Sequence, residues 1–243
     1  MNVWIADDHE ALSGEAAQRI LTAVTAKPDL LLCAAGGATP TRAYQLLVAN
    51  HKTNQRVFRS LRIAKLDEWG GIAMNDPGSC ETQLRKLLVD PLGISAERYF
   101  GMRTNSETPE LECEKLRNRL TMDGTIDICV LGLGMNGHIG MNEPGPALQL
   151  HPHVARLSEV SLRHPMLVNS PTRPTYGLTL GMGDIMSSRE ILLLVSGTNK
   201  REPFQRLMQP AITTQFPASL LRLHPNCHLL CDRDVAQDLK LNP

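Results

Sequence analysis

Residues that can move protons are concentrated in one short stretch of the sequence, residues 127–144 (DICVLGLGMNGHIGMNEP). An apolar run there is followed by closely spaced glycines and then by His138, Asn142 and Glu143. An imidazole titrates near neutral pH, and an adjacent carboxylate can hold one of its tautomers. A second acidic site begins at Asp67, after another strand-like segment. These residues predict general acid–base chemistry, while a structural loop histidine and a helix-capping acid remain the alternatives.

Other kinds of chemistry have little support. No serine lies in a nucleophile elbow, no cysteine accompanies a histidine in one of these loops, and no HExxH pattern is present. The run GLGMNG fits the dinucleotide pattern GxGxxG, but no acid follows about 20 residues later at a strand end. His224, Cys227, His228 and Cys231 raise the question of zinc. Because alternate residues of a strand face opposite ways, these four cannot converge, and we expect no metal site.

A glycine loop at residues 35–41 is a candidate phosphate site. It joins an apolar strand to a helix-like segment, so that backbone N–H groups and the positive helix end face one point. The candidates are Gly36, Gly37, Ala38 and Thr39, with Lys200 as a point charge after another strand. The loop lacks the Lys-Ser/Thr of a Walker motif, and an ordinary turn between strand and helix is the alternative reading.

The elements that must position these residues alternate along the chain. We expect strands at 30–34, 61–71, 127–132, 176–180, 190–197 and 227–232, and a short one near 99–100. Helical spacing covers 9–26, 41–50, 79–88 and 109–120, so that a helix precedes the first strand. The pattern predicts one domain over residues 1–243, an α/β fold with a three-layer, doubly wound, mostly parallel, Rossmann-like sheet and helices on both faces. The four polar loops at 35–41, 66–71, 132–143 and 197–200 then share one end of the sheet.

The amino-acid composition limits the kinds of molecule that this protein is expected to bind. Lys and Arg number 25, as do Asp and Glu, so the formal net charge of zero predicts no nucleic-acid face and no membrane anchor. The absence of a signal-like start and of a long apolar run leads us to expect a cytoplasmic protein. Six scattered cysteines fit a reducing compartment better than a disulfide framework.

On this arrangement the sequence suits a sugar phosphate that bears a carbonyl or opens to one. Such a substrate needs a base that removes a proton from the carbon beside the carbonyl, and a second group that moves protons between oxygens. Asp67 suits the first task if burial raises its pKa, and His138 suits the second. Glu143 is a candidate for holding the imidazole tautomer.

Four motifs, GGATP, LDEW, GLGMNGHIGMNEPG and SGTNK, resemble the glucosamine-6-phosphate deaminase family, and most closely its galactosamine-6-phosphate isomerase branch. The likeness spans almost the whole chain. It implies that the loop around Gly37 binds the sugar phosphate together with Lys200, and that His138, assisted by Glu143, opens the pyranose ring. Asp67 would carry a proton from the second carbon to the first. Ammonia release would then leave a ketose 6-phosphate without a metal or organic cofactor.

Two positions depart from the family pattern. Asn136 stands where glucosamine-6-phosphate deaminases usually have an aspartate; it can orient His138 but cannot stabilise a proton as a carboxylate does. The family's phosphate-binding arginine falls near Leu162, which leaves Arg163, one place later, as a candidate.

Two further functions stay open beside the deaminase. One is 6-phosphogluconolactonase, which shares the fold and a Gly-His motif but lacks the Asn-Glu-Pro at residues 142–144 of this chain. The other is a non-catalytic sugar-phosphate sensor. The sequence leaves the preferred epimer and the oligomeric state undetermined, and a homo-oligomer is possible because the family includes both hexamers and monomers.

Overall fold

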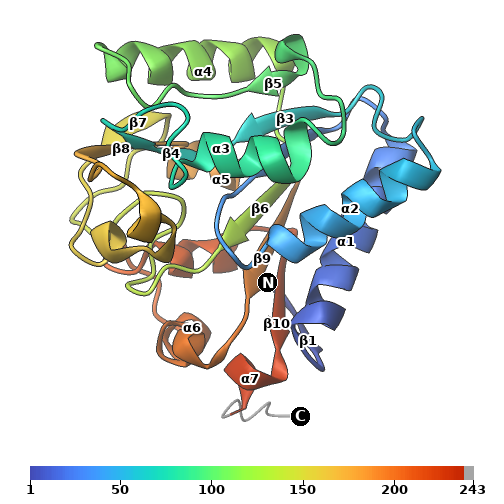
Figure 1. The fold of residues 1–243 in the computed structure, drawn as a ribbon. Helices are drawn as coiled ribbons and strands as arrows, with labels where there is room; N and C mark the ends of the chain where they lie inside the picture. The colour runs from blue at the N-terminus through green and yellow to red at the C-terminus, as the bar shows by residue number, and fades with distance from the viewer. Residues whose placement is uncertain (238–243) are drawn as a thin grey trace.

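A seven-stranded parallel sheet forms the centre of the molecule (Figure 1). The computed structural model describes residues 1–237. The strand order is β1-β10-β9-β6-β2-β3-β5, and every neighbouring pair is parallel. The strands are β1 (Asn2–Ala6), β2 (Leu31–Ala34), β3 (Arg62–Lys65), β5 (Tyr99–Phe100), β6 (Ile128–Gly132), β9 (Glu190–Val195) and β10 (Cys227–Asp232). The predicted α/β fold is thereby confirmed.

Both faces of this sheet are covered, because alternate residues of its strands enter two separate apolar clusters. In β2, Leu32 packs into a cluster with α1 (His9–Ala26), α2 (Thr41–Thr53) and the π-helical turn η1 (Arg85–Val89). Its neighbours Leu31 and Cys33 face the other cluster, with α4 (Pro109–Asp123), α5 (Met182–Met186), α6 (Arg201–Met208) and α7 (Arg233–Ala236). The central strands are apolar throughout because neither face meets water.

A second, three-stranded antiparallel sheet was missed by the sequence analysis. It has the order β4-β8-β7 and consists of β4 (Asp67–Gly70), β8 (Tyr176–Thr179) and β7 (His153–Ala155). The expected single strand at 61–71 was wrong, since the chain changes sheets at Leu66. The strand expected at 176–180 belongs to the small sheet. The periodicity runs through the break unchanged, because both halves are β-like.

The first element is also different from the expectation. β1 precedes α1, so the prediction that a helix comes before any strand was wrong. β1 is an edge strand with only its last residue, Ala6, fully buried. It therefore lacks the continuous apolar run that marks the central strands.

The remaining elements are short. They are α3 (Cys80–Leu84) and the 3-10 turns η2 (Ala96–Arg98), η3 (Ser161–Arg163), η4 (Pro165–Asn169), η5 (Thr198–Lys200) and η6 (Pro217–Leu223). In the described part of the chain, no helix is both long and apolar enough to cross a membrane. Cys227 and Cys231 face the same apolar cluster, whereas His228 accepts from Arg19 and contacts Asn226 elsewhere. The predicted divergence of these side chains is confirmed.

Candidate active site

A small cavity of about 60 Å³ lies at the carboxyl ends of the parallel strands. It is lined by Gly36 after β2, Asp67 and Trp69 of β4, Cys80 of α3, His138, Gly140 and Met141 of the loop after β6, and Ser161, His164 and Met166 of the segment between β7 and β8. Asp67 and His138 are separated by 71 positions in the sequence, and both line this one cavity. Loops far apart in sequence meet here because parallel strands end at one edge.

The glycines of the central loop make room for the imidazole of His138. A Cβ on Gly134 would lie 2.4 Å from the His138 ring, and one on Gly137 would lie 2.1 Å from the ring of Phe216. Gly137 also has a φ of 86°, a region that residues with a side chain rarely adopt. The ring can therefore fold back over the loop that carries it.

His138 is held by a chain of hydrogen bonds that passes through Asn136. The Asn136 side-chain oxygen lies 2.8 Å from Nδ1 of His138, and its amide nitrogen donates to Glu143 Oε2 at 2.8 Å. Since a carboxylate only accepts, the amide nitrogen must face Glu143, and the amide oxygen then accepts from Nδ1–H. Glu143 itself is 3.7 Å from Nδ1, beyond hydrogen-bond length. Asn136 is thus the direct partner that fixes the tautomer, and Glu143 acts through it.

The surroundings shift the pKa values of both titrating groups in this hydrogen-bond chain, His138 and Glu143. Burial lowers the pKa of His138, aided by the charge of Lys200 and opposed by Glu143. For Glu143, burial alone would raise the pKa, but hydrogen bonds from Ser161 and Asn136 and the nearby imidazole outweigh it, so the pKa is lowered. At neutral pH the imidazole is neutral and Glu143 is a carboxylate. The free Nε2 can then accept a proton.

Asp67 has the opposite shift. Burial, followed by repulsion from Glu68, raises its pKa to about 7, while a hydrogen bond from Cys80 and the charge of Lys65 pull the pKa down. The Cys80 thiol, 3.7 Å from Oδ1, is its one side-chain partner among residues 1–237. A carboxyl that titrates near neutrality can both take and return a proton at that pH. Asp67 therefore has the properties of a general base.

Comparison with known proteins identifies the relatives of this chain. Residues 7–229 match the model of the family described as glucosamine-6-phosphate isomerases/6-phosphogluconolactonase. The chain belongs to this family.

The curated and solved relatives agree with that assignment. The chain is 40% identical over 220 residues to AgaI of Escherichia coli, which is a deaminase by assignment only. The alignment covers 90% of this chain and 87% of AgaI. Glucosamine-6-phosphate deaminase 1 of Bacillus subtilis is 34% identical over 240 residues, covering 97% of this chain and 98% of the relative. A solved monomeric glucosamine-6-phosphate deaminase superposes with a TM-score of 0.92 at 34% identity, covering 98% and 99% of the two chains. A 6-phosphogluconolactonase from Trypanosoma brucei shares the fold, with a TM-score of 0.78 at 19% identity and 98% coverage of each chain.

In the predicted phosphate loop, one backbone N–H group is already hydrogen-bonded to a side chain from another part of the protein. Gly36 lines the cavity, but the N–H of Gly37 donates to Gln83 Oε1 at 2.7 Å, and Gln83 Nε2 donates back to the Gly37 carbonyl at 3.1 Å. The amides of Gly36, Ala38 and Thr39 have no partner among the described residues. Three N–H groups of the loop thus remain available to a ligand.

The two predicted basic residues are placed differently. Lys200, at the end of η5, donates to the carbonyl of Leu133 at 2.7 Å, and burial lowers its pKa. It is near enough to depress the pKa of His138. Arg163 is exposed and lies outside the cavity lining. The neighbouring His164 lines the cavity instead, a role that the sequence analysis missed.

Cys80, Trp69 and Met166 were also missed as lining residues. Cys80 and Met166 carry no motif, and their places depend on how α3 and the segment after β7 fold over the strand ends. Trp69 is buried and contacts the ring of His164 at a centroid distance of 5.8 Å. From a single sequence, only residues within recognisable motifs could be assigned to the cavity.

A buried ion cluster lies beside the cavity. Lys65 is fully buried, and its ammonium donates to Glu68 at 2.7 Å, to Glu81 at 2.8 Å and to the carbonyl of Met102 at 2.8 Å. The other oxygen of Glu68 accepts the N–H of Cys80 at 2.9 Å. The cluster therefore joins β3, β4 and α3 into one support beneath the residues that line the cavity.

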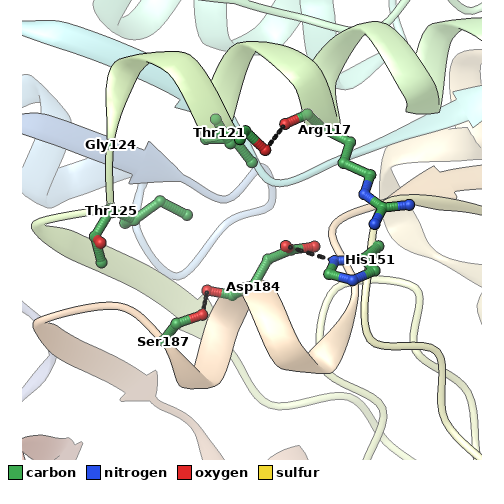
Figure 2. A pocket seen from close by; sticks show the side chains of 9 residues that line it. Arg117, Thr121, Gly124, Thr125, His151, Asp184 and Ser187 are labelled. Carbon is green, nitrogen blue, oxygen red and sulfur yellow. Dashed lines mark hydrogen bonds and ion pairs between the residues drawn. The ribbon is translucent and has the colours of Figure 1, made fainter.

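A second, wider cleft of about 320 Å³ opens between the end of α4 and α5 (Figure 2). Figure 2 shows His151 beside Asp184, at 3.5 Å, with the side chain of Arg117 descending from α4 near them. Burial raises the pKa of Asp184. This cleft contains none of the predicted site residues, although it is larger than the cavity that does.

Proposed function

We propose that this protein is an amino-sugar-phosphate deaminase-isomerase. It converts galactosamine 6-phosphate or glucosamine 6-phosphate into a ketose 6-phosphate and ammonia. The observation that carries the proposal is the joint presence, in one cavity, of a carboxyl with a pKa of about 7, Asp67, and a neutral imidazole whose tautomer is fixed, His138. Relatives that share 34% to 40% identity and are described as deaminases support it.

The first step opens the sugar ring. The Nε2 atom of His138 takes the proton of the anomeric hydroxyl and returns a proton to the ring oxygen as the bond between that oxygen and the anomeric carbon breaks. The imidazolium formed in between is stabilised by Asn136 at Nδ1 and by the negative charge of Glu143 behind it. No net proton is consumed, and an open-chain aldehyde results.

The second step moves a hydrogen along the carbon chain. The carboxylate of Asp67 removes the proton from the carbon that bears the amino group, and an enolamine forms as the aldehyde oxygen takes a proton from the ammonium group of the substrate. Asp67 then returns the proton to the first carbon, which leaves an imine at the second. Water adds to the imine, ammonia departs, and the ketose 6-phosphate remains. The acid–base groups Asp67 and His138 and one water molecule suffice for these steps, so the proposal includes neither metal nor organic cofactor.

The phosphate end of the substrate is assigned to the glycine loop. The unpaired amides of Gly36, Ala38 and Thr39 and the ammonium of Lys200 provide donors for it. The substrate is a small sugar phosphate, and one catalytic domain over residues 1–243 is sufficient for this reaction, a view supported by the family match over residues 7–229.

The test is an ammonia-release assay on both epimers, run beside hydrolysis of 6-phosphogluconolactone. Ammonia release from either amino sugar, with the lactone hydrolysed no faster than in buffer, supports the proposal. Lactone hydrolysis without ammonia release contradicts it and favours the lactonase of the same family. Tight sugar-phosphate binding without any turnover also contradicts it, and favours a sensor.

A further inference from the structure

The position of His164 suggests a function for it. The chain between β7 and β8 crosses the cavity as η3, His164 and η4, and the imidazole of His164 lines the cavity against Trp69. Two residues later, Met166 approaches the glycine loop, since a Cβ on Gly36 would lie 3.6 Å from Met166 Cε. His164 therefore lies on a segment that lines the cavity and contacts the candidate phosphate loop.

The local hydrogen bonds determine which nitrogen of His164 carries a proton. Nδ1 accepts the N–H of Met166 at 3.3 Å, so the neutral ring carries its hydrogen on Nε2. Nε2 has no acceptor among residues 1–237. The cavity is thus lined by a hydrogen-bond donor whose partner is not supplied by the described protein.

The charges near His164 favour an anion. Burial, followed by the charges of His138 and Lys200, lowers its pKa to about 4, and the other titratable groups lining the cavity are Asp67 and Cys80. Burial is the main reason why the ring stays neutral, and at neutral pH the ammonium of Lys200 is the positive charge near it that attracts an anion. A bound phosphate dianion would raise the pKa of the imidazole.

We propose that His164 donates its Nε2–H to the phosphate group of the substrate, and that it takes up a proton when the dianion binds. This inference rests on the proposed function for the identity of the ligand. It replaces Arg163, which the family resemblance left as a candidate, with its neighbour. A histidine in this place makes phosphate binding depend on pH, which an arginine would not.

The experiment uses a hexitol 6-phosphate, which has no carbonyl and cannot react, and measures binding by calorimetry in two buffers of different ionisation enthalpy at neutral pH. For the unaltered protein we expect binding with net proton uptake. For H164A we expect affinity about tenfold to a hundredfold lower, as for the loss of one hydrogen bond to a charged group, and less proton uptake. H164R should bind the hexitol 6-phosphate with less proton uptake than the unaltered protein, because an arginine is already charged. The matched control H151A, an exposed histidine of the other cleft, should retain both affinity and uptake.

The outcomes separate this inference from the proposed function. Equal affinity in H164A and the unaltered protein overturns the inference, as does a loss that appears in R163A instead. If H164A is misfolded by circular dichroism, the comparison of H164R with the unaltered protein decides the matter through proton uptake. If hexitol 6-phosphate binds but neither amino sugar releases ammonia, the proposed function fails while the test of His164 stands.

Discussion

Two neighbouring carboxylates of β4 differ in how far hydrogen bonds and opposite charges compensate them. Asp67 faces the cavity and has one weak partner, the thiol of Cys80 at 3.7 Å. Glu68 is fully buried in the ion cluster, where it accepts from Lys65 at 2.7 Å and from the N–H groups of Cys80 and Glu81 at 2.9 and 2.8 Å. Consecutive strand residues point to opposite faces, which allows this division. The charge that supports the structure is fully compensated, whereas the one assigned to proton transfer is not.

The strongest test of this difference is D67N. Removal of the proposed base should lower kcat for ammonia release by about 10²- to 10⁴-fold, the usual contribution of a general base. Because the folded pKa of about 7 lies above the ordinary value of 3.8, ionising Asp67 destabilises the fold, and this loss accrues as the pH rises through that interval. The Tm of D67N should therefore exceed that of the unaltered protein by more at about pH 8 than at about pH 5. Unchanged turnover, or a Tm difference that is the same at both pH values, would contradict the comparison.

The ion cluster should respond through stability. K65M leaves Glu68 and Glu81 buried without their cation, which should cost about 3–5 kcal/mol of unfolding free energy. Thermal denaturation followed by circular dichroism should show a Tm lower by about 10 °C. The control is R85A, since Arg85 pairs with Glu81 from an exposed position and should cost less than about 1 kcal/mol. Equal losses in the two variants would mean that burial of the cluster has no energetic role.

A smaller effect is expected at Asn136, the link between His138 and Glu143. N136D places a carboxylate beside Nδ1 of His138 and faces Glu143 with a like charge. The anionic partner should raise the pKa of His138 by about one unit, as measured by NMR titration of the imidazole. N136A, which adds no charge, should produce no such rise. If N136A raised the pKa as much as N136D, the hydrogen bond seen here would not govern the tautomer.

The smallest effect concerns Gln83 of α3, the helix that carries Glu81 towards the cluster and Cys80 towards the cavity. Q83A removes both hydrogen bonds to Gly37 and loosens the glycine loop. The KM for the amino-sugar phosphate should rise about threefold, in line with the modest net value of a neutral hydrogen bond, while kcat stays unchanged. Q18A, an exposed glutamine of α1, serves as the control and should leave KM unaltered. A change in kcat rather than KM would show that Gln83 acts on the chemistry.

The parts of this molecule that a single sequence reveals are those with a local signal. The doubly buried strands were predictable because their residues are apolar on both faces, and the glycine loops because a tight turn needs glycine. β1 was missed because four of the five residues of this edge strand are exposed or half-buried, which leaves no continuous buried run. The break at Leu66 was missed because pairing with another sheet leaves no mark on the periodicity of the strand.

The same distinction applies to the candidate site. The proximity of Asp67 and His138 follows from the order of parallel strands, so it could be expected. The contribution of His164 could not, because it depends on how η3 and η4 turn over the cavity. The direct role of Asn136 was recognisable as an orienting one, but its insertion between His138 and Glu143 required three-dimensional distances.

The pairing of β1 with β10 has a consequence for synthesis on the ribosome. Residues Asn2 to Ala6 hydrogen-bond to one strand of the sheet, in register with His228 to Asp232. β1 is therefore translated more than 200 residues before the strand with which it pairs. During that interval its backbone groups stay unmatched, and the nascent chain offers an unpaired β segment to chaperones and to neighbouring polysomes.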